Sequence, residues 1–113
     1  MKLSTKQKLF TRRVALLIEW AYQNGYEITF GDAYRDPRVF GSMGNQAGYG
    51  RKFSNHKIRL AIDLNLFKDG KYLTSTEDHR PLGAYWESLD ESCTWGGRFQ
   101  DGNHYSMEHE GRR

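Results

Sequence analysis

The sequence predicts an α+β fold in which helices flank a small antiparallel sheet. Apolar residues recur at helical spacing within the first 25 residues and again after residue 75. Residues 26–30 and 61–67 instead alternate between apolar and polar, which is the two-residue period of a half-buried strand. With 113 residues the chain has room for one core, so residues 1–113 are predicted to form one domain.

The first helix is predicted to begin near Ser4, because Ser4 and Gln7 have the spacing of a capping box. Its apolar face consists of Phe10, Val14, Leu17, Ile18 and Ala21. Asn24 and Gly25 are expected to end the helix. Its apolar stretch is interrupted by Glu19 and no small-residue cleavage site follows, so we expect a helix here and not a signal peptide.

The first strand, residues 26–30, leads into a polar turn at residues 31–37 that carries Arg35. Residues 38–53 show no periodicity and contain four glycines, which predicts a long loop. Loops of this length inside a compact domain are usually functional or disordered.

The second strand, residues 61–67, has an apolar face and a polar face. The apolar face consists of Ile62, Leu64 and Leu66, and the polar face carries Asp63 and Asn65. Asp69-Gly70 predicts a tight turn, after which residues 71–73 return as a hairpin partner.

A second helix is predicted to start at one of the capping residues 74–76. Its apolar positions are Leu82, Tyr85, Trp86 and Leu89. A sharp turn at residues 95–97 then precedes a closing strand, residues 104–107. We expect Trp95 and Tyr105 in the core and Cys93 as a small buried hydrophobe. His79 has charged neighbours on both sides, which predicts a solvated surface position.

Composition excludes several classes of protein. The single cysteine excludes an intramolecular disulfide and a cysteine-based zinc cluster. No apolar stretch approaches the roughly 20 residues of a membrane span, so no stable membrane insertion is expected. The net charge of +3 favours anionic partners without naming one. Because the cationic residues form no run, a nucleic-acid partner is disfavoured.

Two polar clusters contain residues suited to bind a metal. His56 lies seven residues before Asp63, and His104 lies in the second cluster. A catalytic zinc ion takes three nitrogen or oxygen ligands and leaves a fourth position for water, and these three residues supply such a set. The spacing alone fits equally a hydrogen-bonded histidine near an acid. His109 is a weaker rival to His104 as a ligand.

Two further residues are candidates for catalysis. Asp101 lies three residues before His104, where a turn would place its carboxylate beside a metal as general base. Asp101 could equally cap the turn through its backbone. Arg35 could bind a substrate carboxylate or stabilise an oxyanion, and it could equally pair with Asp32 or Asp36.

Four sequence blocks, taken in order, resemble those of peptidase family M15, which contains D-alanyl-D-alanine carboxypeptidases and phage L-alanyl-D-glutamate endopeptidases. Residues 54–64, SNHKIRLAIDL, resemble the family's S-x-H-x-x-G-x-A-x-D block. Residues 95–99 and 101–105 are similar to its W-G-G-x-W/F and D-x-x-H-F/Y blocks, and residues 33–35 to its G-Y-R element.

This resemblance implies a fold like that of the D,D-peptidases and the hedgehog signalling domain. It also implies Zn²⁺ held by His56, Asp63 and His104, with Asp101 as base. Two departures are Arg59 and Ala33, which stand where the family pattern has glycine. The turn after His56 is therefore expected to be built without glycine's conformational freedom, and a substrate role transfers less securely to Arg35.

The function expected from the resemblance is that of a monomeric L-alanyl-D-glutamate endopeptidase of the phage endolysin type, which hydrolyses this peptide bond in peptidoglycan. Its partners would be peptidoglycan stem peptides. Without a signal peptide, such an enzyme would be made in the host cytoplasm and reach the cell wall through a membrane pore made by another protein. A D-alanyl-D-alanine carboxypeptidase, or a relative without catalysis that binds the cell wall or forms part of a phage particle, is the alternative.

Overall fold

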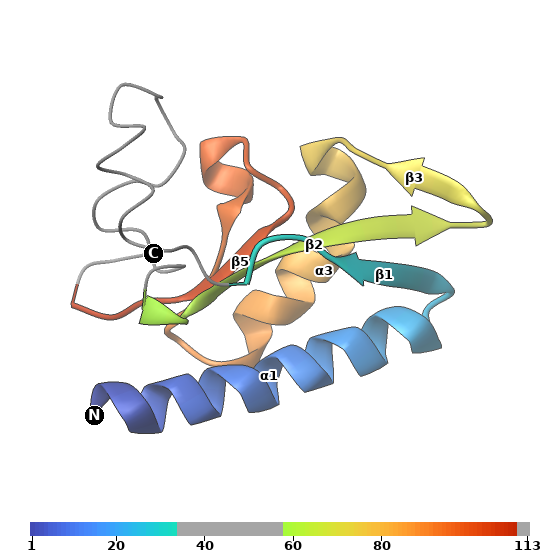
Figure 1. Cartoon of the computed structure of the whole chain (residues 1–113). Coiled ribbons are helices and arrows are strands. Elements are labelled where there is room, and N and C mark those ends of the chain that lie inside the picture. Colours follow the sequence, from blue (N-terminus) through green and yellow to red (C-terminus); the bar gives the residue numbers. More distant parts are fainter. Residues whose placement is uncertain (34–57, 111–113) are drawn as a thin grey trace.

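The structure, a computed structural model, describes residues 1–33 and 58–110 and confirms the α+β class (Figure 1). In chain order the elements are α1 (Leu3–Gln23), β1 (Tyr26–Phe30), β2 (Ala61–Lys68), β3 (Lys71–Leu73), α3 (Thr76–Leu89), β4 (Cys93–Trp95), the 3-10 turn η2 (Gly96–Phe99) and β5 (His104–Met107). No helix within the described ranges is long and apolar enough to cross a bilayer.

The sheet is antiparallel and is organised around β2, its longest strand. The strand order is β1-β2-β5-β4, and β3 also pairs with β2. β1 and β3 pair with the C-terminal half of β2, whereas β5 pairs with its first residues, Ala61 to Asp63. β2 therefore connects the hairpin end of the sheet to the end where the predicted site residues lie.

The hydrophobic core lies between one face of this sheet and the two helices, and we call this face the inner face. The predicted apolar positions of β2 are buried there, and Leu64 and Leu66 are fully enclosed. α1 contributes its predicted stripe of Phe10, Val14, Leu17 and Ala21. Trp86 of α3 packs edge-on against Phe10 and donates a hydrogen bond from its indole to the Ser106 carbonyl (2.9 Å). Both helices are thus tied to the inner face of the sheet.

The helix starts differ from each other in how they are capped. α1 begins one residue before Ser4, its N-cap is Lys2, and no side chain caps it, so the predicted capping box at Ser4 is wrong. At α3 the prediction is confirmed: Ser75 is the N-cap and forms a reciprocal capping box with Asp78. Only the second start satisfies its free N–H groups with side chains.

Three local features depart from the sequence predictions. Residues 93–95 form a short strand, β4, which pairs with β5. His79 is not solvated: its side chain is 2% exposed and its ring contacts Tyr105. Arg59 has φ +58°, so this turn has the left-handed backbone that glycine favours, although an arginine occupies it.

Candidate active site

Asp63 and His104 face each other directly across the β2–β5 ladder. The backbone of Asp63 bonds toward the other side, because its N–H donates to the Asp32 carbonyl and its carbonyl accepts from Gly31 (2.7 Å each). Asp63 and His104 are therefore a non-hydrogen-bonded pair, the kind in which opposing side chains come closest. His104 Nδ1 lies 3.3 Å from Asp63 Oδ1, and the two side chains are 14% and 19% exposed.

This separation fits two ligands of one tetrahedral metal ion. Metal–nitrogen and metal–oxygen bonds of about 2.0–2.2 Å at a tetrahedral angle put the ligand atoms about 3.4 Å apart. An imidazole nitrogen and a carboxylate oxygen are also the donor types that zinc accepts. Within residues 1–33 and 58–110 no three histidine, cysteine or acidic side chains gather around one point. The predicted third ligand, His56, lies outside the described residues, as does Arg35.

Asp101 lies beside this pair on the turn that leads into β5. Its Oδ2 is 4.0 Å from His104 Nδ1, and its side chain is 58% exposed. The turn itself is formed by the backbone, since Asp101 N–H donates to the Gly96 carbonyl and His104 N–H donates to the Asp101 carbonyl. Asp101 thus closes the turn through its backbone, and its carboxylate lies beside His104.

The conformation of this turn is held by its neighbours. The Trp95 indole N–H donates to the Gly102 carbonyl at 2.7 Å, in a buried position. A Cβ at Gly102 would come within 2.6 Å of Thr76 Cα, and one at Gly96 within 2.3 Å of the Asp101 carbonyl oxygen. Glycine is required at both positions, because the backbone of the turn is packed against its supports with no space for a side chain.

Trp95 is itself held between two glycines. A Cβ at Gly83 or at Gly97 would come within 2.1 and 2.3 Å of the indole ring, respectively. Trp95 is 7% exposed, as the core prediction requires, and the Arg80 guanidinium lies 5.5 Å from the ring centroid. The Trp-Gly-Gly sequence thus has a structural role in which the ring supports the turn that carries Asp101.

Beneath the site, on the inner face, His79 and Tyr105 form a buried polar pair. His79 Nδ1 lies 2.8 Å from Tyr105 Oη. Burial lowers the pKa of His79, against a smaller opposing effect of Asp78, and burial raises the pKa of Tyr105. Both groups are therefore neutral near pH 7. The burial of His79 was detectable in the sequence, since it lies three residues before Leu82 and seven before Trp86, on one helix face.

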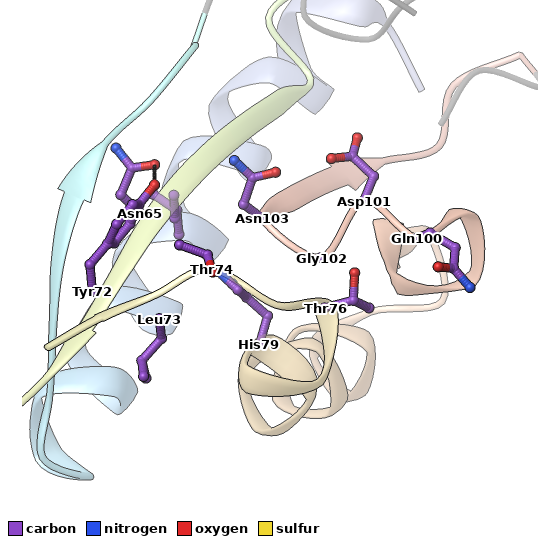
Figure 2. A pocket seen from close by; sticks show the side chains of 11 residues that line it. Asn65, Tyr72, Leu73, Thr74, Thr76, His79, Gln100, Asp101, Gly102 and Asn103 are labelled. Atoms are coloured by element: carbon purple, nitrogen blue, oxygen red, sulfur yellow. Dashed lines mark hydrogen bonds between the residues drawn. The ribbon is translucent and has the colours of Figure 1, made fainter.

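On the outer face, opposite the core, a row of polar groups continues from Asp63 along β2. Asn65 donates to Thr29 Oγ1 (3.3 Å) and accepts from Tyr72 Oη (3.4 Å). Asn65 and Tyr72 form one rim of a cavity of about 190 Å³, and the Asp101–Asn103 turn forms the other (Figure 2). Sequence reasoning placed Asn65 on the polar face but did not identify the cavity, because its two rims are brought together only by the fold.

The remaining histidine candidate has a different partner. His109 Nε2 lies 3.3 Å from Glu110 Oε2.

Cys93 is a free cysteine and its side chain is 4% exposed. Burial raises the pKa of its thiol to about 12, so it is the inert buried residue that was predicted.

Comparisons with known proteins agree with this architecture. The crystal structure of the L-Ala D-Glu endopeptidase ChiX of Serratia marcescens superposes with a TM-score of 0.71 at 14% sequence identity, over 88% of this chain and 77% of that chain. No curated protein sequence gives a significant match. Residues 47–107, more than half of the chain, match a family described as D-alanyl-D-alanine carboxypeptidase. The chain therefore belongs to peptidase family M15.

Proposed function

We propose that this chain is a zinc-dependent peptidase that hydrolyses the stem peptide of bacterial peptidoglycan as an L-alanyl-D-glutamate endopeptidase. The observation that carries the proposal is the Asp63–His104 pair, at 3.3 Å, with the Asp101 carboxylate 4.0 Å from the same histidine nitrogen. Membership of a peptidase family supports the reaction class. The endopeptidase activity of ChiX, which shares the fold, supports the choice of bond.

In this proposal Asp63, His104 and His56 hold the metal, which when bound polarises the scissile carbonyl and lowers the pKa of a bound water. Asp101 is the general base. Its carboxylate takes a proton from the attacking water and then gives it to the leaving nitrogen, so that the amine departs neutral. The exposure of Asp101 suits this role, because a water molecule and a substrate can both reach it. Arg35 is proposed to contact the substrate.

The proposal also covers how the enzyme reaches and binds its substrate. The enzyme acts on peptidoglycan as a monomer, in the manner of a phage endolysin, and reaches the cell wall through a membrane pore made by another protein. The polar outer face around Asp63 and Asn65 would hold the extended peptide. A D-alanyl-D-alanine carboxypeptidase is the second candidate, because the matching family carries that description.

The decisive experiment is mass spectrometry of the fragments released from defined peptidoglycan. Zinc-loaded protein is expected to expose new D-glutamate amino termini, a chelator should abolish the release, and added zinc should restore it. Release of free D-alanine alone would replace the endopeptidase assignment by the carboxypeptidase one. Absence of any fragment from the zinc-loaded protein would contradict a peptidase function.

A further inference from the structure

The positive charge of the molecule is concentrated in α1 and the residues before it. Residues 1–23 carry five basic side chains and one acid, whereas residues 24–113 carry twelve basic and thirteen acidic side chains. The net charge of +3 therefore arises from the α1 segment alone. Residues 34–57 and 111–113, outside the described ranges, contain only one of the acids, Asp36. They therefore do not supply the acids that would neutralise α1.

Two of the cations of α1 are used within the fold. Lys6 Nζ donates a hydrogen bond to the Glu108 carbonyl at 2.7 Å. Hydrogen bonds from Ser92 lower the pKa of Asp90, and the nearby charges of Arg13 and Lys6 lower it further. Lys6 and Arg13 thus contribute to the packing of α1 against the end of the sheet.

Lys8 and Arg12 instead lie on the exposed side of α1. Together with Leu16 they follow one another at intervals of four residues, so the three side chains form a row along the helix. This row lies opposite the stripe that packs in the core, and we call it the exposed row. The ion pairs that lysine or arginine forms among the described residues belong to α3 and η2. Glu19, the one acid of α1, follows Leu16.

The placement of these cations is unfavourable for the helix itself. The N-cap of α1 is Lys2, and its first turn contains no acid, although the positive end of the helix dipole lies there. α3 has the opposite arrangement, with Glu77 and Asp78 in its first turn. Cations that oppose the helix dipole and project into solvent indicate a role outside the fold.

The composition of the exposed row distinguishes between anionic partners. Leu16 is 40% exposed and Met1 is 75% exposed, so apolar side chains lie among the cations. The interface of a phospholipid membrane offers both anionic headgroups and apolar surface, whereas a soluble polyanion offers only the charge. The 21 residues of α1 span about 30 Å and run along one side of the molecule (Figure 1). A row of this kind fits a planar surface.

Binding through the exposed row would leave the candidate active site free. α1 packs on the inner face of the sheet, whereas Asp63 and His104 meet at its outer face. The two surfaces are therefore on opposite sides of the molecule.

We propose that the exposed row of α1 binds the surface of an anionic phospholipid membrane without inserting into its hydrocarbon core. The outer face of the sheet, with Asp63 and His104, then points away from the lipid. For a peptidase of the cell wall, this orientation presents the site to the substrate while the enzyme is held at the membrane. The inference goes beyond the proposed function and does not depend on it.

Co-sedimentation of the full chain with vesicles tests the binding. Vesicles of phosphatidylcholine with phosphatidylglycerol should bind the chain at least about tenfold more tightly than vesicles of phosphatidylcholine alone. Raising the ionic strength from roughly 0.1 M to 1 M should release the chain, because the screening length falls from about 10 Å to about 3 Å. Equal binding to both kinds of vesicle, or binding to neither, overturns the proposal.

Matched double variants locate the contact. Lys8→Gln combined with Arg12→Gln should weaken binding to the phosphatidylglycerol vesicles by about fivefold for each cation removed. Lys68→Gln combined with Lys71→Gln removes the same charge at the exposed β2–β3 turn and should bind as the wild type does. Equal losses in the two double variants would show attraction by net charge alone and would overturn the assignment to α1.

Leu16→Ser separates a lipid surface from a soluble polyanion. This variant should bind the vesicles more weakly than the wild type, because the apolar part of the contact is lost. Double-stranded DNA serves as the polyanion probe and should bind both proteins equally and more weakly than the vesicles do. Unchanged vesicle binding by Leu16→Ser, with DNA bound as tightly as the vesicles, would replace the membrane by a general polyanion.

A polarity-sensitive dye reports the orientation. It is attached at Ala15→Cys, on the exposed side of α1, or at Thr74→Cys, on the rim of the cavity. Cys93 should not react, because it is buried and its thiol pKa is raised. Vesicles should shift the emission of the dye at Ala15→Cys and not at Thr74→Cys, and the reverse pattern overturns the proposed orientation. None of these measurements needs zinc or a substrate, so their outcome is separate from that of the proposed function.

Discussion

His104 and Tyr105 are neighbours in β5, and they belong to two regions with opposite properties. Tyr105 points to the inner face, where it is fully buried, lies edge-on to Trp86 and contacts His79. His104 points to the outer face, where Asp63 and the exposed carboxylate of Asp101 lie nearby. Because successive side chains of a strand point to opposite faces, a residue that stabilises the fold lies directly beside one that is suited to catalysis. Substitutions on the two faces should affect stability and activity separately.

The largest expected effect is on activity and comes from the outer face. Asp101→Asn keeps the size of the side chain and removes the base, so initial rates on peptidoglycan should fall about 10²–10⁴-fold. The free energy of unfolding should change by no more than about 0.5 kcal/mol, because the turn is formed by backbone bonds. Asp69→Asn, the same change at the exposed β2–β3 turn, is the control and should alter neither quantity. A fully active Asp101→Asn protein would remove Asp101 from the mechanism.

The inner face should give the converse result. Leu17→Ala deletes a fully buried side chain of α1 and should lower the free energy of unfolding by about 2–5 kcal/mol in chemical denaturation. Activity per folded molecule should be unchanged, since α1 lies on the other side of the sheet from Asp63. Leu16→Ala, at the adjacent position with 40% exposure, should cost much less. Equal losses at both positions would contradict the observed orientation of α1.

The two faces also differ in how far the sequence predicted them. The strand 61–67 and the face of α1 that includes Leu17 were predicted correctly, because their periodicity is local and strong. β4 was missed because three residues carry no measurable period, and its pairing depends on β5. The burial of His79 was not predicted because two signals conflict. Its charged neighbours indicate a surface position, whereas its spacing from the apolar residues of α3 indicates a buried one.

The site could be predicted only in part, for a related reason. The sequence suggested Asp63 and His104 as partners, but that they lie opposite each other follows from the register of two strands about 40 residues apart. The cavity needed the same register and the β3 hairpin as well. Arg59 was expected to build its turn without the backbone that glycine favours, but this arginine has left-handed φ, at an energetic cost.

Trp95 connects the two faces, so its substitution should lower both the free energy of unfolding and the activity. Trp95→Phe keeps a ring between Gly83 and Gly97 but removes the N–H that donates to the Gly102 carbonyl. The buried carbonyl loses its partner, at a cost of about 1–3 kcal/mol in the free energy of unfolding. Because Gly102 follows Asp101, kcat should fall more than KM rises. A loss of stability with unchanged kcat would show that the tryptophan supports the fold and not the position of the base.

The smallest expected effect is a pH dependence of stability that arises from His79 alone. Burial holds its folded-state pKa below the ordinary value of 6.5, so the unfolded chain binds the proton more readily. The stability that this histidine contributes is complete above pH 6.5 and is lost as the pH falls from there through the folded-state pKa. Urea denaturation of wild type and His79→Gln at several pH values isolates this contribution, because the two proteins differ only at this side chain. The wild type should lose more stability than His79→Gln on acidification, and parallel pH profiles would place His79 in water and not beneath the site.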